Sequence, residues 1–333
     1  MKLDPIIILN EKELRENVHL DHSLIDEIEK GFISLSNKEA TVPPIMMLPV
    51  PKKDGEVDIK SAFVHTMESM AVKIASGFFK NPDIGLPSQS GQMLVISTET
   101  GMLQAVLLDN GYLTQIRTAA AGAIAAKFMA KKEVSAVGVF GCGVQSRYQM
   151  EALSLVRRFD KIVMFSIDTP ERKKAFVDEM KERLNVEVVI AESGEQLVSE
   201  CDIVVTTTPS RKAYFSPKWL HRGLHITSMG SDAEDKQELY ADVFENVDVI
   251  ACDLISQSTR LGELRAPKEA GYLKDLSCVR EIGDIISGRK KGRETDDQIT
   301  VCDLTGVGVQ DTMVAMMAYL IAKDKHIGIE IPR

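Results

Sequence analysis

The segment from Ala136 to Arg147 constrains what this chain can fold into more than any other part of the sequence. It reads AVGVFGCGVQSR, an apolar run that ends in two closely spaced glycines. The apolar residues at 134–140 predict a buried strand, and the stretch at 146–156 is compatible with a helix. A strand that passes through a glycine turn into a helix presents backbone N–H groups at the helix N-terminus, where a pyrophosphate can bind.

The two glycines of this turn have different expected roles. Gly141 permits the tight turn, and Gly143 lets the backbone approach a ligand closely. The usual third glycine of such a fingerprint is replaced by Ser146, so the pattern is G-x-G-x-x-S. We expect a dinucleotide-binding turn, and a purely structural turn is the alternative.

Size, charge and cysteine usage narrow the classes of protein. A chain of 333 residues is long enough for about two domains. Its net charge of −9 argues against a surface for nucleic acid or anionic membrane. We expect no signal peptide, because no long apolar region follows the N-terminus, and no membrane span. The five scattered cysteines contain no C-x-x-C pair, which fits a cytoplasmic protein without a metal site.

The middle third of the chain alternates predicted strands and helices, which is typical of a doubly wound parallel sheet. Strands are expected at 134–140, 161–165, 186–190, 203–207, 224–228, 249–251 and 298–303, with helices at 146–156, 171–183 and 193–200. A ligand is expected at the carboxyl ends of these strands.

The beginning of the chain predicts a different, mixed sheet. Its strands are expected at 62–65, 70–75, 92–97 and 103–109, and its helices at 11–16, 23–34 and 114–131. A final helix at 311–323 carries a methionine stripe that is typical of a core or subunit interface. We therefore expect a dinucleotide-binding domain at 121–310 and a discontinuous α+β domain, formed by 1–120 and 311–333, for substrate binding and dimerisation.

Asp168 follows the second strand of the parallel sheet, where an acidic residue accepts hydrogen bonds from the adenosine ribose. A carboxylate there repels a 2′-phosphate, and positions 166–170 contain no Lys or Arg. The sequence therefore favours NAD over NADP, although Arg172 and Lys173 follow closely. The alternative is that Asp168 only caps the helix that begins near Pro170.

Three polar residues stand in apolar surroundings and are candidates for catalysis. Lys73 interrupts an apolar strand, which is costly unless the ammonium finds a partner. Arg117 precedes a run of small residues, and Asp232 follows a predicted strand at the end where this kind of sheet carries its chemistry. Each also has a structural interpretation: an edge-strand lysine, a surface arginine and a helix-capping aspartate.

Taken together, these residues and their surroundings resemble the ornithine cyclodeaminase/μ-crystallin family. The resemblance runs in order over nearly the whole chain, through Lys73 with 76–78, then 113–120, 141–147, 229–232 with 236–239, 260–264 and 303–311. The segments 59–63, 77–82 and 108–114 are most similar to the subgroup of ectoine-utilisation cyclodeaminases, near iminosuccinate reductase. The resemblance implies a Rossmann-type dinucleotide-binding domain.

The resemblance also implies a reaction. In this family a hydride passes between C4 of the nicotinamide and the α-carbon of a small imino or amino acid. We expect an NAD-dependent imine reductase or amino-acid dehydrogenase, with iminosuccinate as one candidate substrate. An ammonia-releasing lyase that recycles NAD is the alternative, and a non-catalytic ligand-binding protein is a third. Arg117 would grip the α-carboxylate, Lys73 would contact it or donate a proton, and Asp232 would shuttle a proton.

Further residues match the family's contacts. Besides Gly141, Gly143 and Asp168, the implied cofactor contacts are Thr118, Val144, Gln145, Thr207, Thr208, Met229, Gly230 and Ser231. The further implied substrate contacts are Ser88, Lys236 and Thr305. A homodimer is implied as well. One position departs from the family, because Ile45 follows Pro43-Pro44 where relatives often carry a basic residue.

Overall fold

The computed structural model describes residues 4–333, so residues 1–3 of the domain expected at 1–120 lie outside the described range. Contacts between residues divide the chain into two compact units. The first comprises residues up to Arg117 together with Val307–Arg333, and the second comprises Thr118–Gly306. The boundaries expected from the sequence lie a few residues further along the chain.

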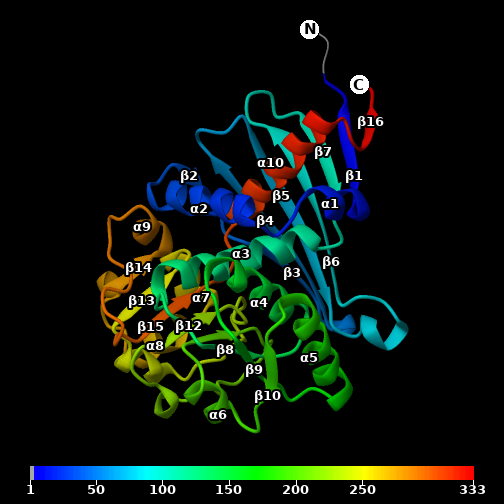
Figure 1. The fold of residues 1–333 in the computed structure, drawn as a ribbon. Coiled ribbons are helices and arrows are strands. Elements are labelled where there is room, and N and C mark those ends of the chain that lie inside the picture. The colour runs from blue at the N-terminus through cyan, green and yellow to red at the C-terminus, as the bar shows by residue number, and fades with distance from the viewer. Residues whose placement is uncertain (1–3) are drawn as a thin grey trace. The chain divides into compact units, whose positions relative to one another are not determined.

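The first unit is built on an eight-stranded mixed sheet (Figure 1). Its strand order is β16-β1-β7-β6-β5-β4-β2, and β3 also pairs with β4. The neighbours from β4 to β7 are antiparallel, β1 is parallel to β7, and β16 is antiparallel to β1. The strands are β1 (Ile6–Asn10), β2 (Ala40–Thr41), β3 (Met46–Val50), β4 (Gly55–Val64), β5 (Ser69–Phe78), β6 (Gln89–Ser97), β7 (Leu103–Leu108) and β16 (Ile329–Ile331).

Helices α1 (Glu11–Asn17), α2 (His22–Ser36) and α10 (Gly308–Lys325) belong to the same unit, with short 3₁₀ turns at Pro51–Lys53 and Asn81–Ile84. Helix α10 packs on β4, β5 and α2. A Cβ on Gly308 would lie 2.2 Å from the carbonyl oxygen of Ser61, so only glycine allows this approach to β4. The Thr312 hydroxyl donates to the Ala62 carbonyl of β4 and accepts from the Ala71 amide of β5. The N-terminal part of α10 is thereby fixed against both strands.

The second unit contains an eight-stranded parallel sheet in the order β10-β9-β8-β11-β12-β15-β13-β14. The doubly wound parallel sheet predicted from the sequence is confirmed. The order reverses at β8, which lies between β9 and β11, and such a switch point is where this architecture binds ligands. The strands are β8 (Ala136–Phe140), β9 (Lys161–Phe165), β10 (Glu187–Ile190), β11 (Ile203–Thr206), β12 (His225–Ser228), β13 (Val249–Cys252), β14 (Val279–Glu281) and β15 (Thr300–Asp303).

The helices of the second unit are α4 (Val144–Val156), α5 (Pro170–Leu184), α6 (Gly194–Ser199), α7 (Ile255–Leu261), α8 (Arg265–Ala270) and α9 (Ile282–Ile286), with 3₁₀ turns at Pro217–Trp219, Ala241–Asn246 and Leu276–Cys278. Helix α3 (Tyr112–Met129) begins in the first unit and ends in the second. Buried apolar side chains cover both faces of the parallel sheet, which accounts for its continuous apolar strands.

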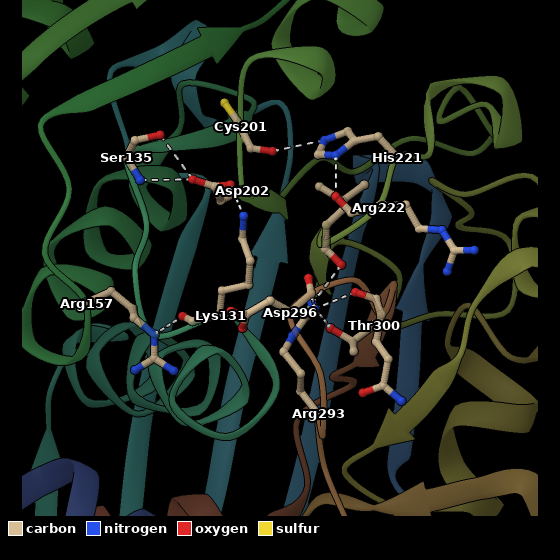
Figure 2. Close-up of polar contacts among 12 residues, drawn as sticks. Lys131, Ser135, Arg157, Cys201, Asp202, His221, Arg222, Arg293, Asp296 and Thr300 are labelled. Atoms are coloured by element: carbon tan, nitrogen blue, oxygen red, sulfur yellow. Dashed lines mark hydrogen bonds and ion pairs between the residues drawn. The ribbon is translucent and has the colours of Figure 1, made fainter.

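Two arginines donate hydrogen bonds to carbonyl groups at and just after the end of α3, where the helix leaves carbonyls without helical partners. Arg157 donates to the carbonyls of Ala126, Lys127 and Lys131, and Arg293 donates to that of Met129. Figure 2 shows both arginines in this region, together with the ion pair from Lys131 to Asp202 at 2.6 Å. These contacts anchor the C-terminal end of α3, the helix that carries Arg117 in its second turn.

All five cysteines are free thiols, and Cys278 alone is exposed. No group of three or more His, Cys, Asp and Glu side chains among residues 4–333 is arranged to hold a metal ion. None of the helices described between those residues is long and apolar enough to cross a membrane.

Candidate active site

The glycine turn after β8 has the geometry expected for an anion-binding loop. Gly141 has a φ of +101°, a left-handed conformation that favours glycine. Gly143 is the N-cap of α4, and no side chain caps this helix end. A Cβ on Gly143 would meet nothing within 4 Å, so open space lies over the first turn of the helix. Val144 is half exposed at this end, and the site therefore fits a pyrophosphate bound to backbone N–H groups.

Ser146, which replaces the third glycine of the fingerprint, has a specific partner. Its buried hydroxyl lies 2.9 Å from the Thr207 hydroxyl, and Thr207 in turn donates to the Phe140 carbonyl at the end of β8. The serine therefore joins the start of α4 to the loop after β11. Thr207 is brought beside the glycine turn by this contact, across the switch point of the sheet.

Asp168 lies beside the same turn. Its carboxylate accepts from the Cys142 thiol at 3.6 Å and forms an ion pair with Arg172 at 2.9 Å. The interpretation of Asp168 as the helix cap is wrong, because the N-cap of α5 is Thr169. Burial raises the pKa of the Cys142 thiol, so this cysteine is a neutral packing residue under the turn.

Two of the other predicted cofactor residues are held through backbone contacts. The Thr118 carbonyl accepts from Gln149, whose side chain also donates to Gln145. The amide of Met229 donates to the Thr206 carbonyl at 3.2 Å, which aligns the loop after β12 with the end of β11. These loops carry Thr208, Gly230 and Ser231, and the Ser231 hydroxyl donates to the Lys236 carbonyl at 2.9 Å.

Asp232 and Lys236 form an ion pair at 2.6 Å within the loop that follows β12. The carboxylate side chain is 42% exposed, whereas that of Lys236 is 16% exposed. A partly exposed carboxylate beside an ammonium can exchange a proton with a bound molecule or with solvent. The structure therefore pairs two predicted site residues that the sequence placed in separate roles.

Thr305, which is expected to contact the substrate, is buried and hydrogen-bonded within the protein. Its hydroxyl donates to Asp253 at 3.0 Å and accepts from Gln257 at 2.8 Å, and the residue is 2% exposed. Asp253 also accepts from the amides of Thr305 and Gly306. The hydroxyl thus joins the loop after β15 to Asp253 and Gln257.

In the first unit, Lys73 and Arg117 converge on a carboxylate that the sequence analysis did not select. Asp311, in the first turn of α10, lies 3.2 Å from the Lys73 ammonium and 2.9 Å from Nε of Arg117. The three side chains are between 0% and 4% exposed. Arg117 also donates to Gln310 at 3.1 Å. The structural alternatives of an edge-strand lysine and a surface arginine are therefore wrong.

The electrostatics of this cluster favour proton exchange near neutral pH. Burial, followed by the charge of Arg117, lowers the pKa of Lys73 to about 7, although Asp311 acts in the opposite direction. Burial tends to raise the pKa of Asp311, but the charges of Arg117, Lys73 and Lys60 together hold it below its ordinary value. The cluster thus combines a permanent carboxylate and guanidinium with an ammonium that can release its proton.

Ser88 lies apart from this cluster. Lys73 pairs with Met93 in the sheet, whereas Ser88 lies just before the start of β6. Five residues of strand separate Met93 from Ser88, which is roughly 17 Å at about 3.3 Å per residue. Ile45, the position expected to depart from the family, directly precedes β3. The register Met46–Ile59–Ile74 across β3, β4 and β5 places Ile45 two strands from Lys73. The structure does not bring Ser88 to the Lys73 cluster.

Sequence reasoning missed Asp311 and Glu238. Asp311 sits in a stretch from Gly308 to Met316 in which every residue is buried, so an acidic residue there required a cationic partner. Glu238 lies in a charged run that resembles a solvated loop, yet it is fully buried. The signal for Asp311 was the apolar stripe around it, and local sequence carried no signal for Glu238.

Known proteins are similar to this chain over nearly its whole length. A protein described as an uncharacterized cyclodeaminase, from Sinorhizobium fredii, is 43% identical over 322 residues, which cover 96% of this chain and 97% of that protein. The solved structure of Δ1-pyrroline-2-carboxylate reductase from Thermococcus litoralis, in complex with NADH and L-proline, is 28% identical. It has a TM-score of 0.92 and covers 98% of this chain and 100% of its own.

An archaeal alanine dehydrogenase, solved as a dimer with bound NAD, has a TM-score of 0.89 at 32% identity and covers 98% of both chains. The family model that matches describes the ornithine cyclodeaminase/mu-crystallin family, and the match spans residues 6–326. This confirms the resemblance inferred from the motifs. The chain belongs to the ornithine cyclodeaminase/mu-crystallin family.

Proposed function

We propose that this protein is an NAD-dependent oxidoreductase that transfers a hydride between the nicotinamide and the α-carbon of a small imino or amino acid. The observation that carries the proposal is the buried cluster of Lys73, Arg117 and Asp311. Two cations meet at a single carboxylate, so the contact has one positive charge in excess. The α-carboxylate of an imino acid supplies the complementary charge.

Each residue of the cluster has a proposed task. Arg117 holds the substrate α-carboxylate through its planar, two-pronged guanidinium, and Asp311 keeps that guanidinium in place. Lys73 gives a proton to the imine nitrogen as the bond between carbon and nitrogen is reduced, and it takes the proton back in the oxidative direction. Its pKa of about 7 suits both directions near neutral pH. NADH, when bound, supplies the hydride that adds to the imine carbon.

The second unit has residues that fit the dinucleotide. The uncapped start of α4 and the open space over Gly143 suit a pyrophosphate, which Gly141, Val144 and Gln145 would surround. Asp168 receives the ribose hydroxyls, which favours NAD over NADP. Thr118, Thr207, Thr208, Met229, Gly230 and Ser231 contribute the remaining contacts. Asp232, paired with Lys236, exchanges a proton with the amino group.

The assignments of the two units follow from these roles. Thr118–Gly306 form the dinucleotide-binding domain, and the residues up to Arg117 with Val307–Arg333 form the domain that binds substrate and dimerises. A homodimer is supported by the dimeric archaeal alanine dehydrogenase and by apolar side chains exposed on β3, where Met46 is 55% and Leu48 50% exposed. Light scattering on the purified protein measures its mass directly and separates a monomer from a dimer.

A lyase of the cyclodeaminase type is the second candidate, favoured by the name of the similar protein from Sinorhizobium fredii. Such an enzyme would use the same residues, but the hydride would return to the product and ammonia would leave. The two candidates therefore differ in stoichiometry, because a lyase consumes no NADH.

The test follows absorbance at 340 nm with NADH and three imine sources: pyruvate with ammonia, oxaloacetate with ammonia, and Δ1-pyrroline-2-carboxylate. Stoichiometric loss of NADH supports the reductase, and the preferred acid shows whether a second carboxylate is recognised. Ammonia release from ornithine without added NADH, and no NADH loss with any imine, would assign the lyase instead. Arg117→Lys keeps the charge but loses the fork and should lower kcat/KM at least tenfold, while Arg183→Lys, on the exposed face of α5, should not.

A further inference from the structure

Glu238 is a buried carboxylate that the proposed reaction does not use. It is 0% exposed and lies between β12 and β13. Its Oε1 atom accepts from the Thr208 amide at 2.7 Å, the Thr208 hydroxyl at 2.6 Å and the Tyr214 hydroxyl at 2.8 Å. Its Oε2 atom accepts from the Thr206 hydroxyl at 2.6 Å and the Gly230 amide at 2.9 Å. Five donors from three segments therefore meet at one side chain.

The loops that Glu238 joins are the two that are proposed to contact the dinucleotide after β11 and β12. Thr206 and Thr208 flank Thr207, and Gly230 is the centre of the Met229–Ser231 segment. The packing between them leaves no spare room, because a Cβ on Gly230 would lie 2.2 Å from the Thr208 carbonyl oxygen and 2.4 Å from Oε2 of Glu238. The carboxylate thus fixes the distance between the two loops.

The same contact closes the loop that carries Asp232 and Lys236. This loop begins at Gly230 and returns at Glu238, and the bond from the Gly230 amide to Glu238 joins its two ends. Inside it, the Ser231 hydroxyl donates to the Lys236 carbonyl. Asp232, the proposed proton shuttle, therefore lies on a loop whose two ends are joined by the Glu238 side chain.

A second buried carboxylate holds Glu238 itself. Glu263 accepts from the Glu238 amide at 2.7 Å and from the Leu239 amide at 3.0 Å. It also accepts from the Gln237 side chain at 2.5 Å. Glu263 thus fixes the backbone of Glu238, whose side chain contacts the two loops. A precisely positioned site requires such support.

We propose that Glu238 is a positioning residue whose carboxylate sets the spacing of the Thr206–Thr208 and Met229–Ser231 loops, and through it dinucleotide affinity and the placement of Asp232. The inference rests on the proposed function. Glutamine has nearly the same shape but only one accepting oxygen. Hydroxyl groups can rotate and accept a hydrogen bond from the NH₂ group of glutamine. The backbone amides of Thr208 and Gly230 can only donate, so neither can bond to that group. Glu238→Gln must therefore release one of the two loops.

The test compares wild type, Glu238→Gln and a control, Glu281→Gln. Glu281 is a half-buried carboxylate in β14 that accepts from the Ile255 amide. Two strands, β15 and β13, separate β14 from β12 in the sheet. The readouts are NADH affinity by fluorescence titration, kcat and KM for the imine, the melting temperature, and amide hydrogen exchange of segments 206–210 and 228–232.

We expect Glu238→Gln to weaken NADH binding at least tenfold, to lower kcat, and to speed exchange in one of the two segments. Glu281→Gln should leave affinity, kcat and exchange there unchanged. Tyr214→Phe removes one of the five donors and keeps the carboxylate, so it provides a milder variant if Glu238→Gln does not fold. It should weaken NADH binding in the same direction, by about fivefold.

The possible failures are distinguishable. A wild-type protein that binds no NADH refutes the proposed function and this inference with it. A wild-type protein that binds NADH, together with unchanged affinity and unchanged exchange in Glu238→Gln, overturns the positioning role alone. A fall in melting temperature without a change in NADH affinity also overturns it, because it would assign Glu238 to stability only.

Discussion

Replacing Asp311 by asparagine should destabilise the first unit strongly. The carboxylate lies 2.9 Å from Arg117 and 3.2 Å from Lys73, and all three side chains are buried. Asparagine keeps the shape and one acceptor but leaves two cations without an opposite charge. Removing one partner of a buried ion pair costs about 3–5 kcal/mol. At roughly 3 °C for each kcal/mol in a unit of this size, the melting temperature should fall by about 10 °C or more.

The effect should also depend on pH, because Lys73 can lose its charge. Asp311 acts to raise the pKa of Lys73, which is about 7, so the substitution lowers that pKa further. Below pH 7 Lys73 is charged both in the folded wild-type protein and in the unfolded chain. In the folded variant, Lys73 either loses this proton or keeps it at a cost in the free energy of folding. The loss of stability should therefore be larger at pH 6 than at pH 9.

Calorimetry at both pH values, with hydrogen exchange of peptides from β5 and α10, measures the effect in the first unit. Asp324→Asn is the matched control, since it is the same substitution at an exposed position of the same helix. If Asp311→Asn is no more destabilising than Asp324→Asn, or if its effect is larger at pH 9 than at pH 6, Asp311 does not hold two buried cations as described.

Three further predictions follow from the geometry of the two units. Reductive kcat/KM should fall above about pH 7 as Lys73 loses its proton, and Lys73→Arg should abolish this decline; an unchanged profile would exclude Lys73 as the proton donor. Gly143→Ala should change the free energy of unfolding by no more than about 0.5 kcal/mol yet raise the KM for NADH at least tenfold. Gly141→Ala should also destabilise the protein, because Gly141 has a φ of +101°. Normal NADH binding by Gly143→Ala would contradict the pyrophosphate site. Asp168→Asn should reduce the preference for NADH over NADPH by about 10-fold or more, measured as the ratio of kcat/KM values, and an unchanged ratio would remove Asp168 from the ribose site.

The parallel sheet could be predicted because its signals are local. The strands from β8 to β11 are short and mostly apolar runs, and every prediction from β8 to β12 overlaps the observed strand. The first unit was harder. Strands β1, β2, β3 and β16 were not expected, and β14 was also missed in the second unit. β1 and β16 pair between distant parts of the chain, and no short-range pattern reports such a partner.

The same distinction applies to the site. Lys73, Arg117 and the glycine turn stand out locally, either as charges in apolar runs or as a strand that enters a helix. The roles of Asp311 and Glu238 depend on groups far away in the sequence. Asp311 forms an ion pair with Lys73, and Glu238 joins the loops after β11 and β12. Tertiary contact, and not composition, distinguishes a structural carboxylate from a solvated one.

The pairing of β16 with β1 has a consequence for solubility that is separate from chemistry. β1 begins with three isoleucines and a leucine, and an uncovered strand of this kind is a template for pairing between molecules. β16 occupies the hydrogen-bonding side of β1 at this edge, and Pro332, which has no N–H group to offer, follows directly after it. The three residues from Ile329 to Ile331 thus shield the chain from aggregation. A change that detached them would appear first as precipitation of an otherwise competent protein.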